Sequence, residues 1–193
     1  MFDLTIKKGY NTMNLPNKLT LFRVFLIPFF VVFMLLDITG EYDKYIAVSI
    51  FIIASLTDLL DGKIARKYNL VTNFGKFMDP LADKLLVCAA LICLIGDKLQ
   101  AWIVIVIISR EFIVSGLRTV ASDNGIVIAA SWWGKVKTTL QMLMIILLII
   151  NLDYKWYSIV EYVFVYAALA LTIISLIDYL VKNRKVLSDG SSK

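Results

Sequence analysis

Six apolar stretches occupy most of the 193-residue chain, and they set the strongest limit on its fold. They cover about residues 19–36, 44–60, 85–96, 101–117, 138–152 and 157–181. A membrane-spanning helix needs roughly 20 residues, so we expect the third and fifth stretches to extend back to about 76 and 133. Charged residues make up only 18% of the chain, against about 25% in soluble domains. These features predict an all-α integral membrane protein with six transmembrane helices.

The positions of lysine and arginine predict how these helices cross the membrane. If the N-terminus is cytoplasmic, 16 of these residues fall on the cytoplasmic side, and only Lys44, Lys98 and Lys155 fall on the other side. Positive charge gathers on the cytoplasmic side of membrane proteins. We therefore expect a multi-pass protein of the cytoplasmic membrane with both termini inside. A net charge of +5 suits anionic lipids and anionic substrates as partners, and we expect no nucleic acid.

Four aspartates lie within 26 residues, where the second predicted helix ends and the third begins. Asp58 and Asp61 are three residues apart, and Asp79 and Asp83 are four apart, so each pair shares one helix face near the cytoplasmic surface. Four carboxylates at one level repel one another unless cations lie between them. The chain has no histidine, and oxygen-only ligands favour Mg²⁺ or Mn²⁺. Two such pairs could form a two-metal site of the kind used in phosphoryl displacement.

Small residues and one arginine surround these aspartates. Gly62 and Ala65 leave part of their helix face bare, so that a planar base or a diphosphate could approach the backbone. The guanidinium of Arg66 suits a phosphate, and Gly75 precedes the next aspartate pair.

The whole pattern, Asp58-x2-Asp61-Gly62-x2-Ala65-Arg66-x8-Gly75-x3-Asp79-x3-Asp83, resembles the signature of the CDP-alcohol phosphatidyltransferase family. Segments 14–23, 109–118 and 134–138 resemble the bacterial members that use sn-glycerol 3-phosphate. The resemblance implies a homodimer of six-helix subunits, each with a polar cavity that faces the cytoplasm and opens to the bilayer. It places the membrane domain at 13–182, with an interfacial or dispensable extension at 1–12 and a flexible tail at 183–193.

The resemblance also implies a reaction and a role for each motif residue. CDP-diacylglycerol would donate a phosphatidyl group to sn-glycerol 3-phosphate, giving phosphatidylglycerophosphate and CMP. The four aspartates would bind two Mg²⁺ or Mn²⁺ ions, and Asp83 would also act as general base. The CDP site would be formed by Asp58, Asp61, Gly62, Ala65, Arg66 and Gly75.

A second group of charges lies on the fourth predicted helix. Arg110 is too far from either end of this helix for its side chain to reach the head groups easily, and charges at such depth usually face a cavity. Adjacent helix positions point about 100° apart, so we expect no direct contact between Arg110 and Glu111. We predict that Arg110 and Arg118, with Lys135 and Lys137, hold the phosphate of the alcohol substrate.

Two alternatives remain at this stage. Relatives with the same metal motif use inositol phosphate, serine or phosphatidylglycerol as the alcohol, and the motif does not distinguish them. The aspartates could also serve a divalent-cation transporter. Transporters place such sites near the middle of the membrane on repeated helices, whereas this chain has its carboxylates at one surface and shows no internal repeat.

Overall fold

The computed structural model describes residues 14–184 except 69–71, 124, 127 and 129–130. The predicted extension 1–12 and most of the predicted tail 183–193 lie outside these residues. Six long α-helices and one short 3-10 helix account for most of the described chain. They are α1 (Leu15–Leu35), η1 (Gly40–Tyr42), α2 (Asp43–Lys67), α3 (Asn73–Cys93), α4 (Ala101–Asp123), α5 (Trp132–Ile150) and α6 (Lys155–Lys182). The predicted all-α fold is confirmed, and α3 and α5 begin within three residues of the expected 76 and 133.

Hydroxyl side chains fix where α3 and α5 begin. Thr72 precedes α3, and its Oγ1 accepts a hydrogen bond of 3.0 Å from the amide of Gly75. Ser131 precedes α5, and its Oγ accepts one of 3.1 Å from the amide of Gly134. Each contact satisfies an amide that has no partner within the helix itself. Both helices therefore start at positions that bring their first charged residues to one end of the bundle.

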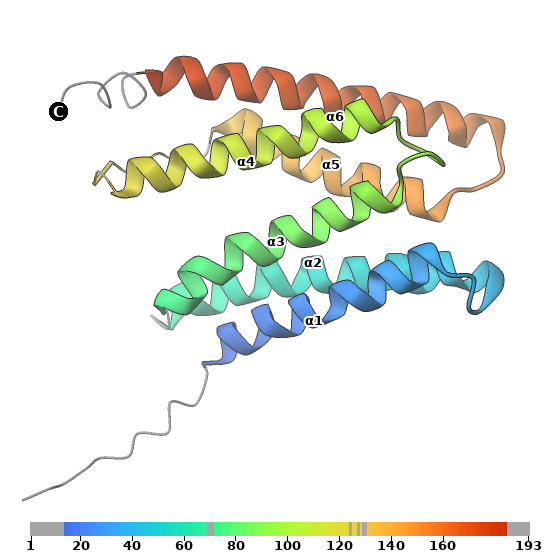
Figure 1. Cartoon of the computed structure of the whole chain (residues 1–193), viewed down its shortest axis with the longest axis horizontal. Helices are drawn as coiled ribbons and strands as arrows, with labels where there is room; N and C mark the ends of the chain where they lie inside the picture. The colour runs from blue at the N-terminus through green and yellow to red at the C-terminus, as the bar shows by residue number, and fades with distance from the viewer. Residues whose placement is uncertain (1–13, 69–71, 124, 127, 129–130, 185–193) are drawn as a thin grey trace, which may run out of the picture.

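The helices pack in two groups that lie side by side along their length (Figure 1). One group contains α1, α2 and α3, and the other contains α4, α5 and α6, with α2 packed against α5 between them. The starts of α1 and α3 and the ends of α2, α4 and α6 all lie at the left of Figure 1. We call this the site end, because the four aspartates belong to it.

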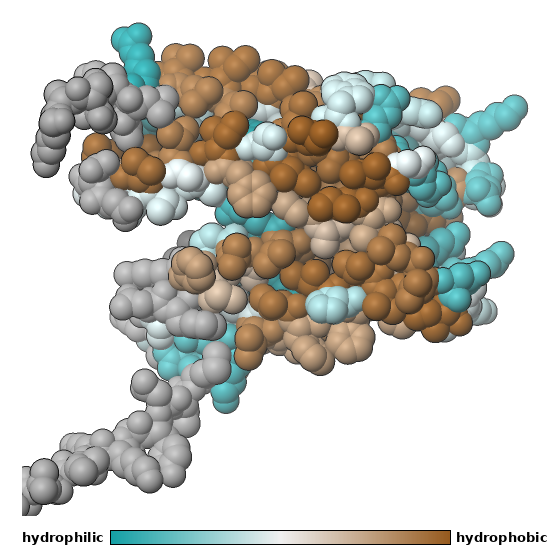
Figure 2. Space-filling view, viewed as in Figure 1, coloured by the Kyte–Doolittle hydropathy of each residue, from teal (hydrophilic) through white to brown (hydrophobic). Residues whose placement is uncertain are grey.

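Four segments of the described chain are long and apolar enough to cross a membrane: Leu15–Leu35, Gly40–Gly62, Trp132–Ile150 and Lys155–Lys182. The helices α3 and α4 fall outside this set. Charged residues interrupt their apolar sequence, namely Asp79, Asp83 and Lys84 in α3 and Arg110, Glu111 and Arg118 in α4. The space-filling view shows apolar residues over the middle of the molecule and hydrophilic residues toward its ends (Figure 2). That α3 and α4 also cross the membrane, which would make six crossings, therefore stays a prediction.

Burial divides the interior into an apolar and a polar part. Phe30 of α1 and Phe51 of α2 are fully buried, with ring centroids 6.0 Å apart, and Leu91 of α3 and Ile107 of α4 belong to the same apolar core. Other fully or nearly fully buried side chains are polar, and they lie nearer the site end: Thr20, Arg23, Asp61, Arg110, Lys137 and Ser175. A cluster of buried polar side chains must have partners within the protein, and these partners define the site.

Candidate active site

The aspartates of α2 are held by an arginine of α1. Arg23 is fully buried, and its Nη1 and Nη2 atoms lie 2.8 Å from Asp58 Oδ1 and 2.5 Å from Asp61 Oδ2. Its Nε donates a hydrogen bond of 3.2 Å to the carbonyl of Ala54. One guanidinium thus joins both carboxylates and a helix carbonyl. Buried charges are stable only when paired and hydrogen-bonded in this way.

A second contact from α1 reaches the aspartates of α3. Thr20 is one turn before Arg23, and its Oγ1 lies 2.5 Å from Asp79 Oδ1. One turn earlier, Asn17 Oδ1 accepts a hydrogen bond of 2.9 Å from Thr72. Three residues at intervals of three on α1 therefore bind the end of α2 and the start of α3. This face of α1 fixes the position of the aspartate pairs relative to each other.

Gly75 lies where no side chain would fit without movement. A Cβ atom at this position would be 3.1 Å from Asn17 Oδ1 and 3.3 Å from Thr72 Oγ1. These distances are shorter than ordinary carbon contacts. The packing of α1 on α3 thus leaves little room for a side chain at the glycine of the motif. The side chains of Ala65 and Arg66 lie outside the described part of the structure, so their place in a CDP site stays a prediction.

A cavity of about 520 Å³ lies next to the aspartates, between α3, α4 and α5. Asp58 of α2 and Asp83 and Lys84 of α3 line it, and so do Arg110, Glu111 and Arg118 of α4 and Lys135 of α5. The surface is hollowed between the two helix groups at the site end, where hydrophilic residues are visible (Figure 2). The structure therefore brings two of the four predicted metal ligands and three of the four predicted phosphate-binding residues around one space. Asp61 and Asp79 do not line it.

Residues of α6 hold both arginines of this cavity. Arg110 is 6% exposed, and its Nε donates a hydrogen bond of 3.1 Å to Ser175 Oγ. The guanidinium of Arg118 lies over the ring of Tyr179, at 5.6 Å from the ring centroid. Ser175 and Tyr179 are four residues apart, so they occupy one face of α6. This face orients two positive charges toward the same cavity.

The expectation that Arg110 and Glu111 do not touch is wrong. Arg110 Nη1 lies 3.4 Å from Glu111 Oε1, and the same oxygen is ion-paired with Lys137. Neighbouring Cβ atoms diverge on a helix, but the two long side chains bend back toward each other. Lys137 is 1% exposed and does not line the cavity, whereas Glu111 does. Lys137 thus reaches the cavity only through the carboxylate that it neutralises.

Two other carboxylates could have neutralised Arg110, but both have partners elsewhere. Glu161 is 3.2 Å from Lys98 at the opposite end of the bundle, and Asp178 is 2.7 Å from Lys182. Only Glu111 shares an ion pair with Arg110 among the described residues, and Glu111 also serves Lys137. The cavity wall therefore keeps an excess of positive charge.

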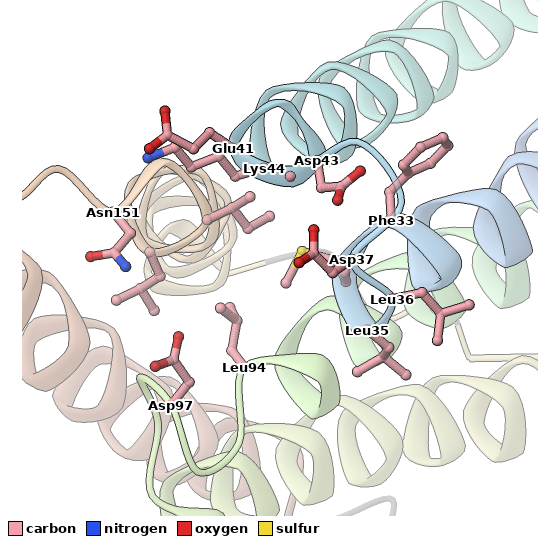
Figure 3. Close-up of a pocket in the computed structure, with 14 residues that line it drawn as sticks. Phe33, Leu35, Leu36, Asp37, Glu41, Asp43, Lys44, Leu94, Asp97 and Asn151 are labelled. Atoms are coloured by element: carbon pink, nitrogen blue, oxygen red, sulfur yellow. The ribbon is translucent and has the colours of Figure 1, made fainter.

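A separate cavity of about 400 Å³ lies at the opposite end of the bundle (Figure 3). Its lining includes Asp37, Glu41, Asp43 and Asp97, with Lys44 beside them. The carboxylate of Asp43 already binds the turn before α2. It accepts a hydrogen bond of 2.7 Å from Thr39 Oγ1 and another of 2.9 Å from the Ile38 amide. An acidic lining repels phosphates. The cavity near the four aspartates is therefore the better candidate for a phosphate-containing substrate.

The sequence interpretation missed the residues that position the others. Arg23 was counted only as a cytoplasmic charge, and Thr20, Ser175 and Tyr179 were given no role. Asn17, Thr20 and Arg23 recur every three residues on a helix that is otherwise apolar except for Lys18, and this signal could have marked a polar face of α1. The two α6 residues carry no comparable pattern, because they face arginines that are more than 60 residues away in sequence.

Comparison with known proteins places the chain among lipid-synthesising enzymes. The model of the CDP-alcohol phosphatidyltransferase family matches residues 13–174. The chain belongs to this family. The predicted resemblance is thus confirmed, and membership in an enzyme family is evidence against the transporter alternative.

Several relatives share one printed name, CDP-diacylglycerol–glycerol-3-phosphate 3-phosphatidyltransferase. The protein of Bacillus subtilis (strain 168) is 48% identical, over 92% of this chain and 99% of its own length. That of Haemophilus influenzae is 45% identical over 92% and 97%, and that of Escherichia coli (strain K12) is 40% identical over 91% and 98%. The similarity therefore covers nearly the whole of each protein.

CDP-alcohol phosphatidyltransferases generally depend on a divalent metal, and the four aspartates suit one in their chemistry. Among the described residues, no three such ligands converge closely enough to hold an ion. Arg23 contacts one oxygen of Asp58 and one of Asp61, and Thr20 contacts one oxygen of Asp79. The second oxygen of each carboxylate takes no part in these contacts. An all-oxygen donor set of this kind fits Mg²⁺ or Mn²⁺.

Replacing Arg23 by methionine tests whether it is the buried counter-ion of Asp58 and Asp61. Two carboxylates would lose their partner, and breaking a buried pair costs about 3–5 kcal/mol. In detergent with EDTA, we expect the thermal unfolding midpoint of purified Arg23→Met to lie several degrees below that of the wild type. This difference should become smaller when Mg²⁺ is added, because the ion supplies positive charge. Lys18→Met is the matched control, since it removes an exposed charge from the same helix. Equal midpoints for both variants in EDTA would contradict this role.

Proposed function

We propose that the protein transfers the phosphatidyl group of CDP-diacylglycerol to sn-glycerol 3-phosphate, giving phosphatidylglycerophosphate and CMP. The lining of the 520 Å³ cavity carries this proposal, because aspartates from α2 and α3 and arginines from α4 line the same space. A diphosphate and a phosphate-bearing alcohol could thus bind face to face. The printed names of relatives that align over nearly their whole length also support the proposal.

The reaction is a displacement at phosphorus. The 1-hydroxyl oxygen of glycerol phosphate attacks the β-phosphorus, the bond from that phosphorus to the CMP phosphate oxygen breaks, and CMP leaves. Asp83 accepts the hydroxyl proton, since it lines the same cavity as the basic residues and no histidine is present. Asp58, Asp61, Asp79 and Asp83 would hold two Mg²⁺ or Mn²⁺ ions. When bound, these ions neutralise the diphosphate and the departing CMP.

The residues around the aspartates would bind CDP. We assign this role to Asp58, Asp61, Gly62, Ala65, Arg66 and Gly75. The close approach of Gly75 to Asn17 and Thr72 supports a compact site there, because a larger residue would press against both side chains.

The basic wall of the cavity would bind the phosphate of the alcohol substrate. Arg110 and Arg118 present guanidinium groups held by Ser175 and Tyr179, and Lys135 adds a third charge. Guanidinium groups bind phosphate through paired, charge-assisted hydrogen bonds. Lys137 contributes by neutralising Glu111, which would otherwise repel the phosphate.

The same proposal includes the setting in the membrane. All six helices would cross the cytoplasmic membrane of the cell as a homodimer, with both termini and the site end facing the cytoplasm. The distribution of lysine and arginine supports this orientation. Glycerol phosphate could then enter from the cytoplasm while the acyl chains of CDP-diacylglycerol stay in the bilayer.

A panel of alcohols tests the proposed reaction. Purified protein is given CDP-diacylglycerol and Mg²⁺ with glycerol 3-phosphate, inositol phosphate, serine or phosphatidylglycerol, and CMP release is measured. We expect release with glycerol 3-phosphate and at least about tenfold less with each other alcohol, because the relatives that align over nearly their whole length are named for glycerol 3-phosphate. Omission of the alcohol and addition of EDTA are the controls. Preference for another alcohol would contradict the proposed substrate, and no release with any alcohol would contradict the reaction.

Replacing Arg110 by glutamine tests the basic wall. A hydrogen bond to a charged group contributes about 1.5–3 kcal/mol, so the KM for glycerol 3-phosphate should rise roughly 10-fold to 100-fold. The KM for CDP-diacylglycerol should stay nearly unchanged, because the four aspartates are unaltered in this variant. Lys182→Gln is the control, since it removes an exposed charge from the same end of the bundle. A KM for glycerol 3-phosphate at the wild-type value would remove Arg110 from the site.

A further inference from the structure

A small recess of about 50 Å³ adjoins the main cavity between α3, α4 and α5. Five of its lining residues also line the main cavity, namely Asp83, Lys84, Glu111, Thr138 and Met142. Gln141 lines the recess but not the main cavity. The recess is therefore a side chamber of the proposed site, and it has room for one small polar group.

Gln141 has a polar atom in need of a partner. Its side chain is 3% exposed, and its amide oxygen is buried without a hydrogen bond to any residue that the structure describes. Natural proteins leave few buried polar groups unpaired, and such a group next to a substrate cavity points to a ligand. Gln141 is one turn beyond Lys137 on the buried face of α5, and from Met144 onward that face is apolar. It is thus the innermost polar residue on this face.

The surroundings of the recess select a hydroxyl group. Asp83 and Glu111 contribute carboxylates, which accept hydrogen bonds, and the charge of Asp83 also repels a second anion. Lys84, which also lines the recess, donates to the carbonyl of Pro80 at 3.0 Å. A hydroxyl carries no charge and can both donate and accept, so it suits either atom of the Gln141 amide.

We propose that Gln141 binds the 2-hydroxyl of glycerol 3-phosphate and so determines the specificity for the alcohol. This inference rests on the proposed function. The alcohol substrate has three polar groups, of which the phosphate meets the arginines and the 1-hydroxyl meets Asp83. The 2-hydroxyl is the one that remains. Asp83 lines the recess as well, so the 2-hydroxyl could reach the recess when the 1-hydroxyl next to it meets Asp83.

An analogue without the 2-hydroxyl, 3-hydroxypropyl phosphate, gives a direct test. For the wild-type protein, kcat/KM from CMP release should be about tenfold or more higher with glycerol 3-phosphate, since one buried hydrogen bond is lost with the analogue. Gln141→Met keeps the size of the side chain but removes its polar atoms. In this variant the ratio should fall to about twofold or less, mainly because activity on glycerol 3-phosphate is lost. Met144→Leu, one turn further along α5, should keep the wild-type ratio.

The outcomes separate this inference from the proposed function. Equal use of the two alcohols by wild type, or the same ratio in Gln141→Met as in wild type, would overturn the role of Gln141 and leave the reaction standing. Release of CMP with neither alcohol by wild type would instead contradict the proposed function. If Gln141→Met is inactive with both alcohols, Gln141→Asn takes its place, and a ratio below half the wild-type value supports the inference while an unchanged ratio overturns it.

Discussion

The buried guanidinium of Arg23 is the contact on which the site depends. It lies between Asp58 and Asp61, and without it two carboxylates of α2 would face each other in a region with little water. Thr20, on the same face of α1, holds Asp79 of α3. One helix therefore positions both halves of the aspartate motif. The cost of burying these charges is met by contacts within the protein, which is the usual condition for ionisable groups at membrane depth.

The basic half of the site is positioned in a similar way, by contacts from another helix. The α6 residues Ser175 and Tyr179 hold Arg110 and Arg118, and Lys137 offsets the charge of Glu111. The cavity between the halves is thus lined by carboxylates from α2 and α3 and by guanidinium groups from α4. Such a division suits a reaction that joins a metal-bound diphosphate to a phosphate-bearing alcohol. In contrast, no arginine of the described chain lines the acidic cavity at the opposite end of the bundle.

Much of the fold could be predicted from the sequence, because apolar stretches and charge positions are local signals. They placed six helices, and the spacing of Asp58, Asp61, Asp79 and Asp83 identified the family. Contacts between helices were harder to foresee. Arg23, Ser175 and Tyr179 gained their roles only through partners far away in sequence, and the contact of Arg110 with Glu111 depends on how two flexible side chains bend. The burial of Lys137 likewise follows from packing, since the sequence predicted only that it joins Arg110, Arg118 and Lys135 at the substrate phosphate.

The central claim is that the aspartates of α2 and α3 act as one unit, and a double-mutant cycle tests it most directly. CMP release would be measured for Asp58→Asn, Asp79→Asn and the double variant with CDP-diacylglycerol, glycerol 3-phosphate and Mg²⁺. Residues that act together show losses that do not add, so each single change should reduce kcat more than about tenfold, and the double change should reduce it little further. Retention of more than about a tenth of the wild-type rate by Asp79→Asn, or losses that multiply in the double variant, would contradict the claim.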